Sequence, residues 1–165
     1  MNIYGFAMQM EKDGENYYRQ LAEQSGSAGL KKIFVMLANE EVKHYHVVEL
    51  LSKKSGSPQM AETKVLENVK NIFVEMRATK DVPHIDTTTE TQSYRKARDL
   101  EEESRKFYLE KAGQAENEEE RRILLQLAGE EGKHLRIMEN IVDFVSRPEP
   151  GHWLENAEWH HLLEY

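Results

Sequence analysis

The sequence predicts an all-α protein, a four-helix bundle made of two similar antiparallel hairpins. Apolar residues recur every three or four positions through four long segments, the spacing of helices that bury one face. Glycine and proline are sparse, at 9 and 4 of 165 residues, and 32% of residues are charged, as in long exposed helices. The chain also repeats itself: residues 11–51 align without a gap with residues 101–141 and share 12 of 41 positions. A long period seen twice indicates a duplicated hairpin rather than a solenoid.

The first hairpin is expected to contain helices over residues 3–24 and 28–55. Ser25-Gly26-Ser27 ends the first helix and caps the second, and Gly56-Ser57-Pro58 ends the second. The inward face of the first helix is expected to be Tyr4, Ala7, Glu11, Gly14, Tyr18 and Leu21. The inward face of the second is expected to be Leu30, Phe34, Leu37, Glu41, His44, Val48 and Leu51.

The second hairpin is expected over residues 88–115 and 118–146. Thr87 and Glu90 have the spacing of a capping box at its start, and Pro148 stops its second helix. The inward face of its first helix is expected to be Tyr94, Ala97, Glu101, Ser104, Tyr108 and Ala112. The corresponding residues of its second helix are Leu124, Leu127, Glu131, His134, Met138, Ile141 and Val145.

The segment between the hairpins is too long for a simple turn. It spans residues 56–87, and 61–76 has helical spacing. Such a crossover can return along the bundle and place the third long helix parallel to the second. We therefore expect one domain over 1–146, with pseudo-repeats 1–55 and 88–146, followed by a tail over 147–165. The tail is expected to form a short amphipathic helix that packs on the bundle or on a partner subunit.

Polar residues interrupt these inward faces at matching places, and they predict a site for two metal ions. Each half carries one Glu, followed 30 residues later by a Glu-x-x-His pair. The six candidate ligands are Glu11, Glu41, His44, Glu101, Glu131 and His134. Four carboxylates in an apolar core are costly unless cations neutralise them, and two divalent ions balance four glutamates. Ligation without sulfur suits iron or manganese, while zinc can substitute.

Within this site, we assign one histidine to each ion. Glu41 and Glu131 are predicted to bridge the ions, whereas Glu11 and Glu101 are predicted as terminal ligands. Tyr18 and Tyr108, seven residues after the terminal glutamates, are expected either to hydrogen-bond the carboxylates or simply to pack in the core. For these two tyrosines the sequence leaves both alternatives open.

Other polar residues carry simpler expectations. A lone histidine on an inward face is usually a packed core residue, and only the duplication favours metal ligation here. Solvated helix charges are expected at Glu40, Glu102, Glu103, Glu130 and Glu118 to Glu120. His46 lies off the inward face and is expected to be exposed. The remaining histidines, His84, His152, His160 and His161, are expected to bind no metal at this site.

Composition excludes several functional classes. The net charge of −8 argues against nucleic-acid and anionic-membrane surfaces, which need clustered Lys and Arg. The sequence contains no cysteine, so a disulfide framework, a thiolate nucleophile and Cys-ligated metal sites are excluded within it. No apolar run has the length of a membrane span, and the first residues lack the pattern of a signal peptide. We therefore expect a cytoplasmic protein.

Four segments resemble the rubrerythrin-like branch of the ferritin-like superfamily. They are Glu11-x6-Tyr18-x3-Ala22, Glu40-Glu41-Val42-Lys43-His44, Glu101-x6-Tyr108-x3-Ala112 and Glu130-Glu131-Gly132-Lys133-His134. The resemblance covers residues 1–146 with all six ligand positions, and the end of the chain is similar to tails of this branch. It implies a ferritin-like bundle with a carboxylate-bridged di-iron centre, reduction of hydrogen peroxide, and a homodimer.

The chain departs from that family pattern in two ways. Full-length rubrerythrins carry a Cys-ligated rubredoxin domain that delivers electrons, so this cysteine-free chain would need an external donor such as a separate rubredoxin. Rubrerythrins also tend to have an additional Glu in the third helix that exchanges with a His. Here Ser104 stands three residues after Glu101, and Arg98 three before it, which disfavours such an exchange.

Three functions compete at this stage. The first is an oxidoreductase that reduces hydrogen peroxide, or reacts with dioxygen, at two iron ions. The second is ferroxidation and iron storage in a large assembled shell, which uses the same ligands. The third is a non-catalytic helical bundle that binds a partner protein. Metal content, assembly state and the preferred oxidant discriminate among them.

Overall fold

The computed structural model describes residues 2–54, 60, 63–81 and 88–146, and within these ranges every regular element is a helix. The helices are α1 (Ile3–Gln24), α2 (Ala28–Lys53), α3 (Val65–Thr79), α4 (Thr88–Gly113) and α5 (Glu118–Val145). The predicted all-α bundle is confirmed. The boundaries of the four long helices agree with the predicted ones to within two residues, whereas the crossover helix lies three to four residues further along the chain than predicted.

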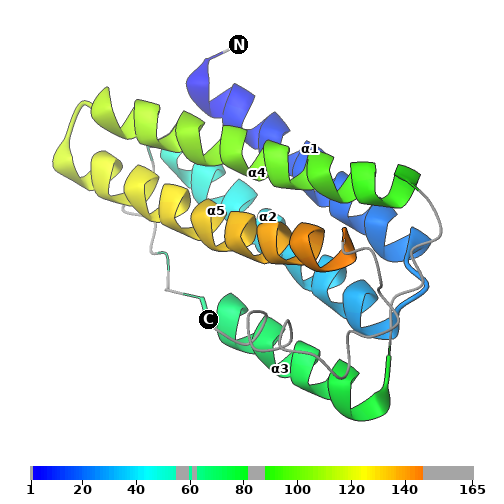
Figure 1. Cartoon of the computed structure of the whole chain (residues 1–165). Coiled ribbons are helices and arrows are strands. Elements are labelled where there is room, and N and C mark those ends of the chain that lie inside the picture. Colours follow the sequence, from blue (N-terminus) through cyan, green and yellow to red (C-terminus); the bar gives the residue numbers. More distant parts are fainter. Residues whose placement is uncertain (1, 55–59, 61–62, 82–87, 147–165) are drawn as a thin grey trace.

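Two antiparallel hairpins form the bundle. In Figure 1, α1 packs against α2, α4 packs against α5, and α4 runs parallel to α2 as a long crossover permits. Helix α3 belongs to that crossover and lies against α2 and α5, on the opposite side of the bundle from α1 and α4. The predicted tail and the threonine of the predicted capping box lie outside the described residues.

Local capping explains where the long helices begin. The side chains of Asn2, Ser27 and Asn117 accept hydrogen bonds from backbone N–H groups three residues later, and so satisfy donors that a helix start leaves unpaired. At the start of α2, Asp81 accepts further hydrogen bonds from Gly29 N at 2.7 Å and from the Ser27 hydroxyl at 3.2 Å. A carboxylate here also complements the positive end of the helix dipole. Asp81 thereby fixes the end of α3 against the first hairpin.

The core consists of two apolar clusters with a polar layer between them. One cluster contains Tyr18, Phe34 and Ile137, and the other contains Ala7, Val48 and Leu127. On each long helix the inward Glu or Glu-x-x-His residues lie between positions of the two clusters. Water is therefore kept from the polar layer at both ends.

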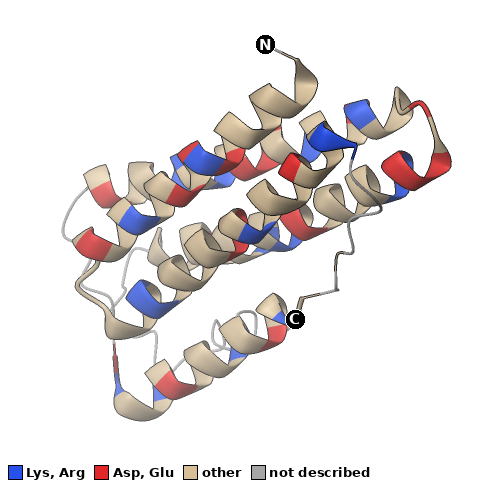
Figure 2. Ribbon diagram, turned by 180° about the vertical axis from the view of Figure 1, so that it is seen from behind, with Lys and Arg blue, Asp and Glu red and all other residues tan. Residues whose placement is uncertain are grey.

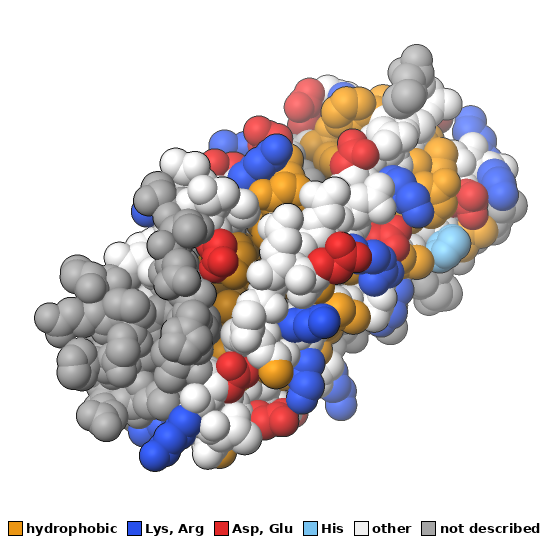
Figure 3. Space-filling model, turned by 90° about the vertical axis from the view of Figure 1, so that its right-hand side faces the viewer, with side chains coloured by type: hydrophobic (Ala, Val, Ile, Leu, Met, Phe, Trp, Pro, Cys, Tyr) orange, Lys and Arg blue, Asp and Glu red, His pale blue; other side chains and the backbone are white. Residues whose placement is uncertain are grey.

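The outer surface is polar, as the composition requires. Each of the five helices carries both acidic and basic residues (Figure 2). On the face seen in Figure 3, charged side chains surround narrow strips of hydrophobic ones. Within the described residues, no helix is both long and apolar enough to span a membrane.

Candidate metal centre

The structure brings the six predicted ligands together in the polar layer. Each long helix supplies its residues from one inward face, because positions three and four apart share a face. All six side chains are buried, with at most 4% of their surface exposed: Glu11, Glu41, His44, Glu101, Glu131 and His134. Such burial is rare for carboxylates without a compensating partner.

These residues form two overlapping groups, in each of which four ligand atoms lie within 4.8 Å of one another. One group contains Glu11 and His44, and the other contains Glu101 and His134. Glu41 and Glu131 belong to both. This is the sharing expected of bridging carboxylates, although the assignment of bridging and terminal ligands stays a prediction.

Histidine–glutamate contacts join the two hairpins within the polar layer. His44 Nδ1 lies 3.0 Å from Glu131 Oε1, and His134 Nδ1 lies 2.9 Å from Glu41 Oε1. Each imidazole therefore turns its Nδ1 toward the carboxylate of the other half. His44 Nδ1 is also 3.6 Å from Glu11 Oε2.

The two predicted tyrosines also reach across the bundle. The Tyr18 hydroxyl donates to Glu101 at 2.6 Å, and the Tyr108 hydroxyl donates to Glu11 at 2.5 Å. The sequence left open whether these tyrosines hydrogen-bond the carboxylates or only pack in the core, and in the structure each donates to the glutamate of the other hairpin. Burial and nearby glutamates raise the pKa of both phenols well above 10, so both stay protonated and remain hydrogen-bond donors.

The four buried glutamates lie close enough together to shift one another's pKa values. Burial, followed by the charges of nearby glutamates, raises the pKa of Glu41 and of Glu131 well above the ordinary 4.5. Burial opposes ionisation of Glu11 too, but a hydrogen bond with Glu41 and the adjacent His44 lower its pKa to about 2. The same balance lowers the pKa of Glu101, mainly through His134. Without cations, protons on the shared pair must therefore relieve the repulsion.

Several donor atoms in the layer have no hydrogen-bond partner. They are the Oε2 atoms of Glu11, Glu101 and Glu131 and the Nε2 atoms of His44 and His134. Buried polar atoms are normally paired, so unpaired carboxylate oxygens beside imidazoles are the donor atoms that a bound cation would satisfy. The donor set, four carboxylates with two imidazoles, fits divalent iron or manganese.

Two glutamates that we expected to be solvated are buried instead. Glu130 is 5% exposed, because Thr63 of the crossover covers it and donates to its Oε2 at 2.5 Å, while Lys133 donates to its Oε1 at 2.9 Å. Glu40 is 7% exposed, and an oxygen of its carboxylate lies within 4.8 Å of ring nitrogens of both buried histidines. The expectation failed because Thr63 of the crossover covers Glu130, whereas Glu40 lies beside the inward face of α2 and is covered when the two hairpins meet. The exact match of Glu40 and Glu130 in the repeat is the signal that could have found them.

The other glutamates that we expected to be solvated are exposed or half-buried. Glu103 and Glu118 are exposed and Glu102 is half-buried, whereas Glu120 is half-buried and accepts a hydrogen bond from the Tyr4 hydroxyl. The side chain of His46 is 64% exposed, as predicted. His84, His152, His160 and His161 lie outside the described residues.

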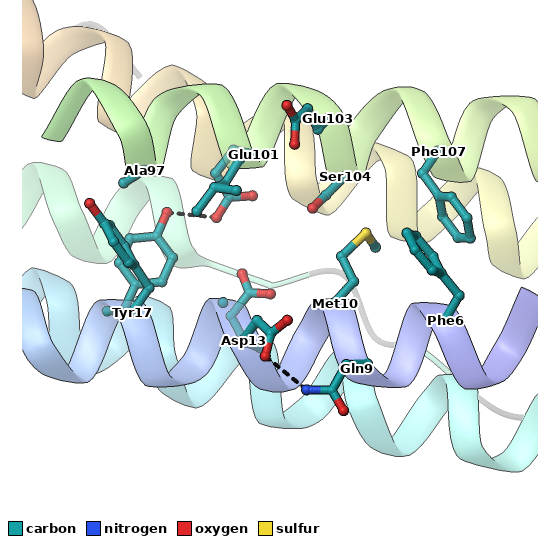
Figure 4. Close-up of a pocket in the computed structure, with 14 residues that line it drawn as sticks. Phe6, Gln9, Met10, Asp13, Tyr17, Ala97, Glu101, Glu103, Ser104 and Phe107 are labelled. Carbon is teal, nitrogen blue, oxygen red and sulfur yellow. Dashed lines mark hydrogen bonds between the residues drawn. The ribbon is translucent and has the colours of Figure 1, made fainter. Parts of the chain in front are cut away.

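A cavity connects the polar layer with the exterior. It has a volume of about 510 Å³, lies between α1 and α4, and is lined by residues that include Glu41 and Glu101 (Figure 4). Ser104 and Gly14, which are equivalent positions of the repeat, both line it. The sequence analysis did not predict this opening.

Comparison with known protein families decides the classification. The family model described as Rubrerythrin matches residues 2–142. The chain belongs to the rubrerythrin family. The search of curated proteins and the search of solved structures returned no significant match. Membership implies that this rubrerythrin-family chain binds iron and is a di-iron carboxylate protein of the oxidoreductase type. It also suggests a peroxide or oxygen substrate and a redox partner.

Proposed function

We propose that this protein reduces hydrogen peroxide to water at two iron ions, with electrons from a separate donor protein. The observation that carries the proposal is the pair of overlapping four-residue groups that share Glu41 and Glu131. Two ions in adjacent groups suit a two-electron reaction, because each ion changes by one electron only. Family membership supports the same oxidoreductase class.

The side chains divide into two half-sites under this proposal. Glu11 and His44 would hold one ion, Glu101 and His134 the other, and the shared pair would contact both. When bound in reduced form, the ions supply the two electrons that split the O–O bond of peroxide. Manganese or zinc in place of iron would fill the same donor set.

The chain's own residues would orient the centre and manage protons. Tyr18 and Tyr108 keep their protons and hold the outer carboxylates from opposite sides of the layer. Glu41 and Glu131 carry protons in the metal-free state and release them when cations bind, since ligation requires the ionised form. The two apolar clusters exclude bulk water from both ends of the polar layer, which strengthens the contacts there.

The electron donor is proposed to be a separate protein. The 165 residues contain no cysteine, and therefore no Cys-ligated iron site of the rubredoxin type. A separate rubredoxin is a suitable donor. We also propose a cytoplasmic homodimer as the working form.

Stopped-flow mixing of anaerobically reduced, iron-loaded protein with each oxidant tests this proposal. We expect oxidation by about one equivalent of hydrogen peroxide per pair of ions, faster than by dioxygen, because one peroxide accepts both electrons. Turnover should require an added donor. Fast reaction with dioxygen, slow reaction with peroxide and continued iron uptake by a large oligomer would instead identify an iron-storage protein. Unchanged thermal stability after chelation would support a non-catalytic bundle.

A further inference from the structure

The cavity between α1 and α4 has a polar floor and mostly apolar walls. Its inner end is formed by Glu41, Glu101 and the Tyr18 ring, which belong to the candidate metal centre. Aromatic and aliphatic side chains such as Phe6 and Met10 make up most of the remaining lining (Figure 4). The lining also includes the polar residues Gln9, Asp13, Glu103 and Ser104. A site with this division suits a molecule with one polar end and an apolar body.

The cavity exists because both inward faces carry small residues at one level. Gly14 of α1 and Ser104 of α4 occupy the same position of the repeat, where a larger side chain would close the gap. A Cβ on Gly14 would lie 3.2 Å from Glu41 Oε2, so the α1 backbone passes directly beside a shared carboxylate. The small residues Gly14 and Ser104 therefore leave the polar layer accessible between α1 and α4.

Contacts between the two helices define both ends of the cavity. At one end Phe6 and Phe107, labelled in Figure 4, lie with ring centroids 5.1 Å apart. At the other end the Tyr17 hydroxyl donates to Ser93 O at 2.8 Å. Phe6 is 53% exposed, so it borders both the cavity and solvent. A molecule in the cavity could therefore contact this ring while its polar end faces the carboxylates.

Hydrogen peroxide leaves most of this space unused. A water molecule occupies about 30 Å³ of liquid, so a molecule with two oxygens needs roughly twice that volume. The cavity, at about 510 Å³, falls in the size range of sites for organic ligands. We propose that the cavity admits organic hydroperoxides, with the peroxide group at the carboxylate floor and the apolar body against Phe6, Met10 and Phe107. This inference rests on the proposed function and extends its substrate class.

The proposed reaction balances with two electrons from the iron pair, two protons from solvent and the external donor that the proposed function already requires. The O–O bond of ROOH breaks, two electrons come from the reduced iron pair, and two protons are taken up to give ROH and water. The two irons end one electron more oxidised each, and the external donor protein returns both electrons. The Tyr18 hydroxyl, which donates its proton to Glu101, lies at the floor, and its oxygen can accept a hydrogen bond from the entering hydroperoxide or the departing alcohol.

Calorimetry with 2-phenyl-2-propanol, the alcohol product of cumene hydroperoxide, tests occupancy without any turnover. We expect this probe to bind the oxidised, iron-loaded protein. Phe6→Ala should raise its Kd about tenfold because it removes apolar contact area, and Ser104→Leu should raise it about tenfold because the larger side chain fills the cavity. Leu109→Ala is the matched control, since Leu109 is 41% exposed on α4 but does not line the cavity. Absence of binding, or an equal loss in Leu109→Ala, would overturn the inference.

Stopped-flow measurement with cumene hydroperoxide and hydrogen peroxide then tests the chemistry. The rate ratio of the organic to the inorganic peroxide should fall about tenfold in Ser104→Leu, because only the larger substrate needs the filled space. Reaction with hydrogen peroxide alone would overturn this inference and leave the proposed function intact. Failure of both peroxides would overturn both.

Discussion

The two hairpins provide nearly identical surroundings inside the polar layer and different ones outside it. Inside, the crossed tyrosine–glutamate bonds measure 2.6 and 2.5 Å, and the crossed histidine–glutamate contacts measure 3.0 and 2.9 Å. Each half therefore holds the other half's residues in the same way. The duplicated sequence produces a site with two equivalent halves, because each tyrosine–glutamate bond and each of the shortest histidine–glutamate contacts joins one hairpin to the other in the same way.

Outside the layer, the equivalent residues Glu40 and Glu130 differ. Glu130 has partners for both oxygens, through Thr63 and Lys133, whereas Glu40 is paired on one oxygen by Lys43 and unpaired on the other. The crossover supplies Thr63 to one half only. A single chain segment thus distinguishes two halves that are otherwise alike, and the following tests ask how far the equivalence extends.

The shared carboxylates should show the largest effect. We expect Glu41→Ala and Glu131→Ala each to reduce iron content from about two ions per chain to well below one, because each lies in both groups. Metal analysis after anaerobic reconstitution measures this. Loss of only half the iron in either variant would show that these residues do not bridge the two half-sites.

The histidines should show half of that effect. His44→Ala and His134→Ala are each expected to remove about one ion per chain, since each belongs to a different half-site. His46→Ala is the control, because that side chain is 64% exposed and should not affect iron content. Unequal losses in the two histidine variants would break the equivalence of the halves, and loss in the control would disprove the assignment of the inward face of α2.

Helices and candidate ligands could be predicted from the sequence because both follow helical spacing. Glu41 and His44 fall on the apolar face of their helix, and the 90-residue repeat supplies an independent copy. The burial of Glu40 could not be predicted in the same way, since it lies beside that face and becomes covered only when the hairpins meet. The cavity was missed for a similar reason: it depends on Gly14 and Ser104 meeting across two helices.

The metal-free protein should be more stable against unfolding in mild acid than at alkaline pH. Because Glu41 and Glu131 have raised pKa values, the folded state retains protons that the unfolded chain releases near 4.5, and stability falls as pH rises above that value. The raised pKa of His44 acts in the same direction through 6.5, where the unfolded imidazole loses its proton first. Glu11, with its pKa near 2, contributes stability above 4.5 that is lost only in stronger acid.

Thermal unfolding between about pH 5 and 8 measures how the stability of the metal-free protein changes with pH. The Tm of metal-free protein should decrease toward alkaline pH, while the increase in Tm on adding ferrous iron should grow, since binding replaces the retained protons. The groups that face the shared carboxylates are Glu11, Glu101, His44, His134, Tyr18 and Tyr108. A Tm of the metal-free protein that rises over this range would contradict the proposed protonation of the shared pair.

The smallest expected effects distinguish the outer glutamates. Glu130→Ala should lower the free energy of unfolding of the metal-free protein by about 2 kcal/mol, because it leaves Thr63 and Lys133 without their buried partner. Glu40→Ala should change it by less than about 0.5 kcal/mol, since one oxygen of Glu40 is buried without a partner and its removal relieves that cost.

Iron loading should bring out a role for Glu40 that the metal-free protein lacks. When Nδ1 of a histidine binds a metal, its Nε2 carries the proton, and Glu40 is the buried acceptor with an oxygen to spare beside both rings. Glu40→Ala should therefore weaken iron affinity about tenfold, as loss of such an acceptor typically does. Competition with a chelator measures the affinity, and Glu40→Gln, which keeps an acceptor oxygen, should restore part of it. Equal iron affinity in Glu40→Ala and the unaltered protein would show that neither histidine depends on this carboxylate.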